Sequence, residues 1–167
     1  FDSVYVSFYK DLGGIAGAML VGDADFIARA KVWQRRVGGT LYALYPYVIA
    51  AREGLARHLQ ALPERRQQAR WLAEQLNQLP GVSTWPNIPH TNMFRMRIRC
   101  QPEAFLVKGE CWMRQNNIAL IPPPYRTDDD ALHCEINVGD AFDLLEKDEW
   151  AAWIQQFGKD MADTLTA

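Results

Sequence analysis

A lysine stands where a strand-like run of the sequence meets a glycine-rich turn. Residues 4–8 are β-branched or aromatic apart from Ser7, and Lys10 follows them just before Gly13-Gly14. Strands that end in such turns carry side chains to the rim of a sheet, where α/β enzymes gather their reacting groups. An amine held there can form a Schiff base with a carbonyl cofactor if its surroundings lower its pKa. Position alone leaves two interpretations of Lys10, a reacting amine and a solvated surface lysine.

The other side chains that often do chemistry show weaker patterns. Cys100, Cys111 and Cys134 are odd in number and lack the spacing of a metal or redox motif. We therefore expect reduced core thiols, a cytoplasmic protein and no metal site. His58 and His90 have no partner that the sequence identifies, and we expect both to be surface or hydrogen-bonded residues.

Composition argues against two classes of protein. The chain has 167 residues, of which 49% are apolar, so a sizeable core can form. The formal net charge is -2, and the densest basic run, residues 64–70, is typical of a solvated helix face rather than of a nucleic-acid footprint. No apolar run approaches the roughly 20 residues that a membrane span needs. We expect a soluble protein without a nucleic-acid or membrane partner.

The elements that would position Lys10 alternate between strand and helix patterns. Two short buried strands, residues 4–8 and 18–21, flank the lysine turn. Asp23 is a good N-cap for an amphipathic helix that ends at Arg35-Arg36. The remaining elements of this half are an apolar stretch from Leu41 to about His58, with Pro46 near its start, and a helix from about Pro63 to Leu79. Together these two form a helical connector.

After Pro80-Gly81 the period of the pattern changes, which indicates a second, smaller domain. Its predicted strands are residues 82–85, 92–99, 118–121 and 132–138, and its predicted helices begin at Pro102 and Glu146, the latter reaching Leu165. In the strand 92–99, the arginines share one face, which we expect to be exposed. The run Asp128-Asp129-Asp130 is predicted to be a polar loop.

The start of the chain is abrupt. It begins with Phe1 rather than Met and enters a predicted strand within a few residues. We therefore expect that an N-terminal part has been removed. Residues that would accompany Lys10 in a complete site would then lie outside this chain.

A series of residues in a fixed order carries a family resemblance. They are Asp2-Ser3, Lys10, Leu12-Gly13, Gly17, Leu20-Val21-Gly22, Phe26-Ile27, Arg29-Ala30, Trp33 and Gly38-Gly39, followed by Thr91-Asn92-Met93-Phe94. This series resembles the threonine aldolases, of the aldolase and β-eliminating lyase group of pyridoxal-phosphate (PLP) enzymes. The resemblance implies an α/β architecture of PLP fold type I. Residues 1–39 would be the last strands and lysine loop of the large cofactor domain, 40–79 a helical connector, and 80–167 a small C-terminal α+β domain.

The resemblance also implies roles for three residues. Lys10 would bind pyridoxal 5′-phosphate as an internal aldimine and then move protons at the substrate Cα. Enzymes of this group hold the substrate carboxylate with an arginine on a strand of the small domain. His133 lies at or next to that position, and Arg126, slightly upstream, is the second candidate. Each also has a structural interpretation, as a hydrogen-bonded strand histidine and a solvated loop arginine.

The sequence departs from the family pattern beside the lysine. Tyr9 stands where the family usually has a small hydroxyl residue, and Asp11 stands where it usually has glycine. Asp11 would favour the charged form of the Lys10 amine. The family supplies the phosphate cup, the stacking ring and the pyridine-nitrogen aspartate from upstream sequence. We therefore expect this chain alone to bind the cofactor poorly and to be inactive.

The favoured function is that of a PLP-dependent lyase acting on a small-molecule amino acid. It would cleave a β-hydroxy or related amino acid through Lys10, as a homo-oligomer (dimer or tetramer) or together with the missing N-terminal part. The alternative is a catalytically silent homologue or fragment that acts in subunit assembly, with Tyr42, Tyr45 and Tyr47 in the interface.

Overall fold

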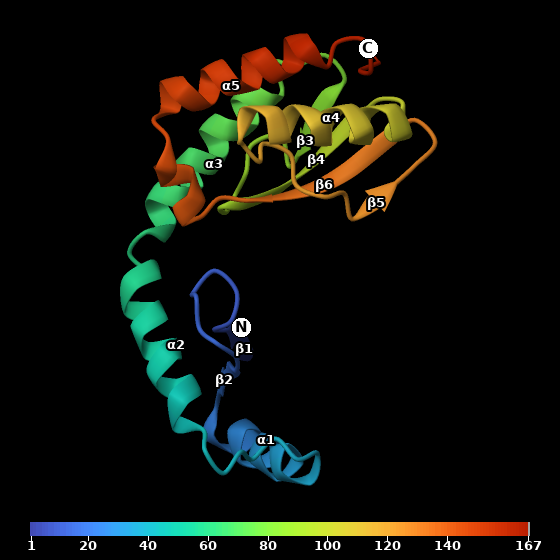
Figure 1. The fold of residues 1–167 in the computed structure, drawn as a ribbon. Coiled ribbons are helices and arrows are strands. Elements are labelled where there is room, and N and C mark those ends of the chain that lie inside the picture. The colour runs from blue at the N-terminus through green and yellow to red at the C-terminus, as the bar shows by residue number, and fades with distance from the viewer. Residues whose placement is uncertain (167) are drawn as a thin grey trace. The chain divides into compact units, whose positions relative to one another are not determined.

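The computed structural model describes residues 1–166, which form two compact units (Figure 1). Unit 1 comprises Phe1–Ala61, and unit 2 begins at Leu62. Helix α3 (Leu62–Leu76) belongs to unit 2 because it packs against two of that unit's strands and against its last helix. The predicted division into three domains, with boundaries at residues 39 and 79, stays a prediction.

Unit 1 consists of a two-stranded sheet and two helices. β1 (Ser3–Ser7) pairs antiparallel with β2 (Ala18–Gly22), and these are the two strands that flank the lysine turn. The helices are α1 (Ala24–Arg36) and α2 (Tyr45–His58). α1 begins where the sequence predicts, because the Asp23 side chain accepts a hydrogen bond of 2.7 Å from the Phe26 amide. The prediction that both strands are buried is wrong, since most of their residues are exposed.

Unit 2 is a four-stranded antiparallel sheet with three helices on one face (Figure 1). The strand order is β3-β4-β6-β5, and the strands are β3 (Val82–Trp85), β4 (Met93–Arg99), β5 (Arg126–Thr127) and β6 (Ala131–Asn137). The helices are α3, α4 (Pro102–Asn116) and α5 (Lys147–Asp160), and a 3₁₀ turn spans Asp140–Leu144. The other face of the sheet carries no helix among residues 62–166.

The core of unit 2 follows from the period-two pattern of its strands. Phe94, Met96 and Ile98 of β4 are buried, while the alternate residues of that strand are exposed, as predicted. β6 contributes Leu132 and Cys134 to the same core. The inner face predicted for the last helix is also found, with buried Ile154 and Phe157 and buried Met161 just beyond its end.

Three details of the predicted elements are wrong. Residues 118–121 form no strand, because Asn117 ends α4 in a left-handed conformation (φ 52°) and three prolines without amide donors follow at 122–124. The last helix ends at Asp160, before the predicted Leu165, and Thr164 then bonds back to the Met161 carbonyl. β5 was not predicted, since two residues are too few to show a period.

The cysteines divide between core and surface. Cys100 and Cys134 are buried free thiols, and burial raises the pKa of Cys134 to about 11. Cys111 is exposed on α4, so the prediction of a core position is wrong for this thiol. Within residues 1–166, no helix combines the length and the apolar character that crossing a membrane requires.

Candidate functional site

Lys10 lies in the turn between β1 and β2, with its side chain exposed. The Gly13 amide donates a 2.9 Å hydrogen bond to the Lys10 carbonyl, and the Gly14 amide donates a 2.6 Å bond to the Phe8 carbonyl. Gly13 has φ +67°, and a Cβ on Gly14 would lie 2.8 Å from the Phe8 oxygen. The two glycines therefore let the turn fold back against the end of β1, with Lys10 as its first residue.

Helix α2 supports this turn from another part of unit 1. Leu12 is the buried residue of the turn, and its carbonyl oxygen would lie 1.8 Å from a Cβ on Gly54. The His58 ring also lies against the turn, with Nε2 3.0 Å from the position of a Cβ on Gly13. No sequence pattern links Gly54 or His58 to Lys10, so sequence reasoning missed both contacts.

Two phenols accompany the lysine. The hydroxyls of Tyr5 and Tyr9 are 3.3 Å apart. The pKa of Tyr5 is below its ordinary value, first because of its hydrogen bond with the Ser7 side chain, then because of Tyr9 and the charge of Lys10. Tyr9 was noted in the sequence as a departure from the family pattern, whereas Tyr5 was missed.

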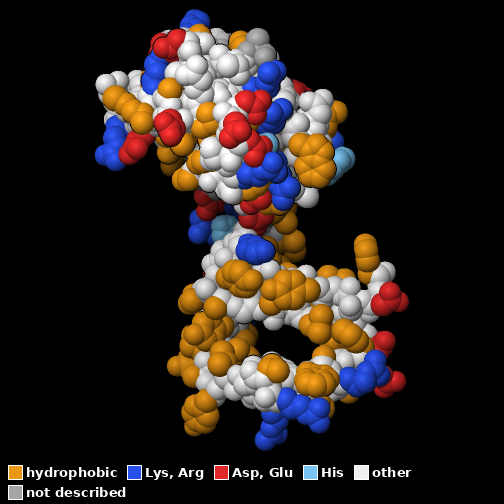
Figure 2. Space-filling model, turned by 90° about the vertical axis from the view of Figure 1, so that its right-hand side faces the viewer, with side chains coloured by type: hydrophobic (Ala, Val, Ile, Leu, Met, Phe, Trp, Pro, Cys, Tyr) orange, Lys and Arg blue, Asp and Glu red, His pale blue; other side chains and the backbone are white. Residues whose placement is uncertain are grey.

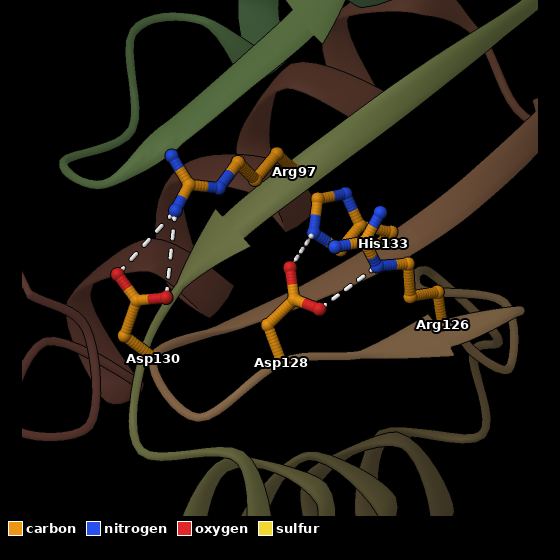
Figure 3. Close-up of polar contacts among 5 residues, drawn as sticks. All are labelled: Arg97, Arg126, Asp128, Asp130 and His133. Carbon is orange, nitrogen blue, oxygen red and sulfur yellow. Dashed lines mark hydrogen bonds and ion pairs between the residues drawn. The ribbon is translucent and has the colours of Figure 1, made fainter.

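The other two predicted site residues lie on the open face of the sheet in unit 2 (Figure 3). Arg126 of β5 is directly opposite His133 of β6, and both bind Asp128. Arg126 Nε donates to Oδ1 at 2.8 Å, and His133 Nε2 is 2.9 Å from Oδ2. These hydrogen bonds, Arg126 first and His133 second, hold the pKa of Asp128 below its ordinary range.

The structure thus brings two of the three predicted site residues together on one carboxylate. Asp128 was predicted only as part of a polar loop, and its contact with His133 was missed because the pairing of β5 with β6 was not predicted. Lys10 belongs to unit 1 and is described there by itself. Within residues 1–166, no group of three or more His, Cys, Asp and Glu side chains is arranged to hold a metal ion.

Comparison with protein families and curated sequences points to one group of enzymes. A family model described as "Beta-eliminating lyase" matches residues 1–99. Low-specificity L-threonine aldolase 1 of Arabidopsis thaliana is 32% identical over 120 residues, which cover 72% of this chain and 34% of that protein. The low specificity L-threonine aldolase of Escherichia coli K12 is 31% identical over 123 residues, covering 74% of this chain and 35% of that protein.

Two solved structures resemble nearly the whole chain. A protein of Exiguobacterium sp. 255-15 is provisionally described as an aromatic amino acid beta-eliminating lyase/threonine aldolase, and it superposes with a TM-score of 0.89 and 38% identity. A protein of Listeria monocytogenes EGD-E is provisionally described as an L-allo-threonine aldolase, and it superposes with a TM-score of 0.86 and 35% identity. Each alignment covers 96% of this chain and 45% of the other. The chain spans about a third of the length of the curated relatives it matches.

Proposed function

Because this chain belongs to the threonine aldolase and β-eliminating lyase family, we propose that it is a portion of a PLP-dependent lyase that cleaves a β-hydroxy or related amino acid. The comparisons confirm the family that the sequence predicts. The observation that carries the proposed activity is the lysine turn, which presents an exposed amine at the end of β1 within the segment that the family model matches.

The lysine turn fits covalent attachment of PLP. The Lys10 side chain is exposed, and Gly13 and Gly14, which carry no Cβ, let the turn pack closely against Phe8 and His58. When bound, PLP would supply a conjugated ring that draws electrons from the substrate Cα while one of the bonds of that carbon breaks. Lys10 would hold the cofactor through Nζ, and the free amine of Lys10 would take up or return the proton at Cα.

We further propose that His133 and Arg126 bind the substrate carboxylate. In support, the pair already binds one carboxylate, that of Asp128, with a separate partner on each oxygen. A carboxylate held at both oxygens is fixed in orientation as well as in position. The substrate carboxylate would take the place of the Asp128 carboxylate. Asp128 lies in the short exposed turn between β5 and β6.

Cofactor attachment tests the role of Lys10. The complete lyase of which we propose this chain to be a portion is incubated with excess PLP, reduced with borohydride and digested, and the modified peptide is identified by mass spectrometry. We expect the label on Lys10, and we expect its loss, together with the cofactor's visible absorbance band, in Lys10→Ala. The matched control is Lys31→Ala, since Lys31 is also an exposed lysine of unit 1. Labelling spread evenly over exposed lysines, or an unchanged band in Lys10→Ala, would refute the proposal.

A second candidate function, subunit assembly without catalysis, is favoured by the exposed side chains of α2 and the segment before it. Tyr42 is fully exposed, and Tyr45, Val48 and Ile49 are each more than half exposed. Apolar side chains gathered in this way are typical of an interface. A complete protein that forms oligomers in solution but takes up no PLP at Lys10 would support this function over the lyase.

A further inference from the structure

A small pocket lies beside His133 on the open face of the sheet in unit 2. Its volume is about 360 Å³. The side chains that line it and carry the argument are Ser83, Trp85, Arg95, Arg97, Tyr125 and His133. They come from β3, β4, β6 and the residue before β5, so the pocket spans the sheet.

Arginine and histidine side chains cross this face from strand to strand. The register puts Arg97 opposite His133 and puts His133 opposite Arg126. The guanidinium groups of Arg97 and Arg126 give this face positive charge, which attracts anions. Here Asp128 binds Arg126 and His133, and Asp130 binds Arg97 at 3.3 Å (Figure 3). The chain's own carboxylates thus occupy positions where this face attracts anions.

Arg95 is a cation of the same face that these carboxylates do not bind. Its guanidinium carbon lies 5.5 Å from the centre of the Tyr125 ring, over the ring face. Glu135 is opposite Arg95 in the register, but the two side chains form no ion pair in the part of the chain that the structure describes. A guanidinium stacked on a ring keeps its N–H edge available for a carboxylate.

Aromatic surface adjoins the arginines. Trp85 is opposite Arg95 in the register and is 71% exposed, and Tyr125 is 53% exposed. An exposed indole beside a guanidinium offers a flat apolar contact next to an anion-binding group. The Arg97–Asp130 ion pair is also exposed, with 43% of the Arg97 side chain and 62% of the Asp130 side chain accessible. Such a pair contributes little to stability, so Arg97 can exchange Asp130 for another anion.

We propose that this pocket binds an aromatic carboxylate, with the carboxylate on Arg95 and Arg97 and the ring on Trp85. The volume of about 360 Å³ is near the lower limit for small-molecule sites, roughly 300–1,000 Å³, and suits one ring. Asp130 and Glu135 on the same face disfavour a doubly charged phosphate. The pocket shares His133 with the substrate-carboxylate site proposed above, but the carboxylate contacts proposed here are with Arg95 and Arg97, and this binding requires neither Lys10 nor PLP.

Titration of the full chain with benzoate tests the proposal. Binding is followed by NMR of the tryptophan indole N–H signals, with the Trp85 signal assigned from its absence in Trp85→Phe. We expect a saturable shift of the Trp85 signal, with a dissociation constant on the order of millimolar for so small a ligand. Arg95→Gln should weaken binding by about 10-fold or more, since it removes a charge-assisted hydrogen bond. Arg99→Gln, on the same face of β4 but outside the pocket, is the matched control and should change affinity less than about 2-fold.

Three further ligands separate the parts of the proposed site. Acetate lacks the ring, benzyl alcohol lacks the charge, and both should bind more weakly than benzoate. A benzoate titration without saturation, or equal affinity in wild type and Arg95→Gln, would overturn the proposal. Phenyl phosphate binding more tightly than benzoate would overturn the choice of a carboxylate. If circular dichroism shows that Arg95→Gln is unfolded, Arg95→Lys replaces it, and we expect the loss of the guanidinium fork to weaken binding.

Discussion

The two compact units bury their apolar side chains to very different extents. In unit 2, Phe94, Met96 and Ile98 are at most 2% exposed and lie in one core with residues of three helices. In the described residues of unit 1, the buried apolar side chains are Leu12 and Ala51, each 8% exposed. Figure 2 shows hydrophobic side chains over much of the visible surface of unit 1, around a hollow. The cavity lined by β2, both helices and residues next to the strands of this unit has a volume of about 710 Å³.

The difference separates a unit with its own core from a unit whose apolar surface is open. A two-stranded sheet is marginally stable by itself and needs apolar cover. Exposed apolar patches of this kind mark surfaces that pack against other protein. The lysine turn therefore belongs to unit 1, which has few buried apolar side chains. The His133–Asp128–Arg126 cluster lies on the well-packed sheet of unit 2. Three predictions test this contrast, from the largest expected effect to the smallest.

The largest effect is expected in the core of unit 2. Phe94→Ala should lower the free energy of unfolding by about 3–5 kcal/mol, because it leaves a cavity in a packed core. Leu20→Ala in β2 is the matched change in unit 1 and should cost no more than about 0.5 kcal/mol, since Leu20 is 41% exposed. Urea unfolding of both variants measures the difference. Equal costs would show that unit 1 is packed as tightly as unit 2.

Within unit 1, the stability should be sensitive to added side-chain volume where α2 contacts the lysine turn. Gly54→Ala would put a Cβ 1.8 Å from the Leu12 oxygen, so the turn or α2 must move, at a cost of about 1–3 kcal/mol. Amide exchange at Gly13 should rise with the displacement of the turn. Gly139→Ala is the control, because no atom lies within 4 Å of its Cβ position. If Gly54→Ala matched this control in stability and exchange, α2 would not be holding the turn.

The smallest effect is expected at Asp128, on the surface of unit 2. Because Arg126 and His133 lower its pKa in the folded state, Asp128 stabilises the fold above its ordinary pKa of 3.8, and this contribution disappears as the pH falls through the folded value. The difference in urea midpoint between wild type and Asp128→Asn should therefore be fully present above the ordinary pKa of 3.8 and shrink as the pH falls below it. A difference that grows on acidification would have the wrong sign for this interaction.

Much of the fold was predictable because local patterns dictate it. The N-cap Asp23, the alternation along residues 92–99 and the glycines after Lys10 each specify a conformation through nearby atoms. Residues 118–121 have the composition of a strand but no partner, because the chain leaves α4 through Asn117 and meets the prolines. β5 exists only because two residues reach the edge of β6. Pairing of this kind depends on tertiary position and not on local preference.

The sequence by itself determined the family, the lysine at the end of a strand and the order of most elements. These depend on residue identity and on interactions between close neighbours along the chain. The tertiary structure alone decided that α2 supports the lysine turn through Gly54 and that Asp128 joins Arg126 to His133. It also decided that Trp85, Arg95 and Tyr125 line one pocket. The Gly54 contact and the pocket join segments that are distant in sequence, and only packing and strand register bring them together. Asp128 is close to Arg126 and His133 in sequence, and the pairing of β5 with β6 gives the three side chains their arrangement.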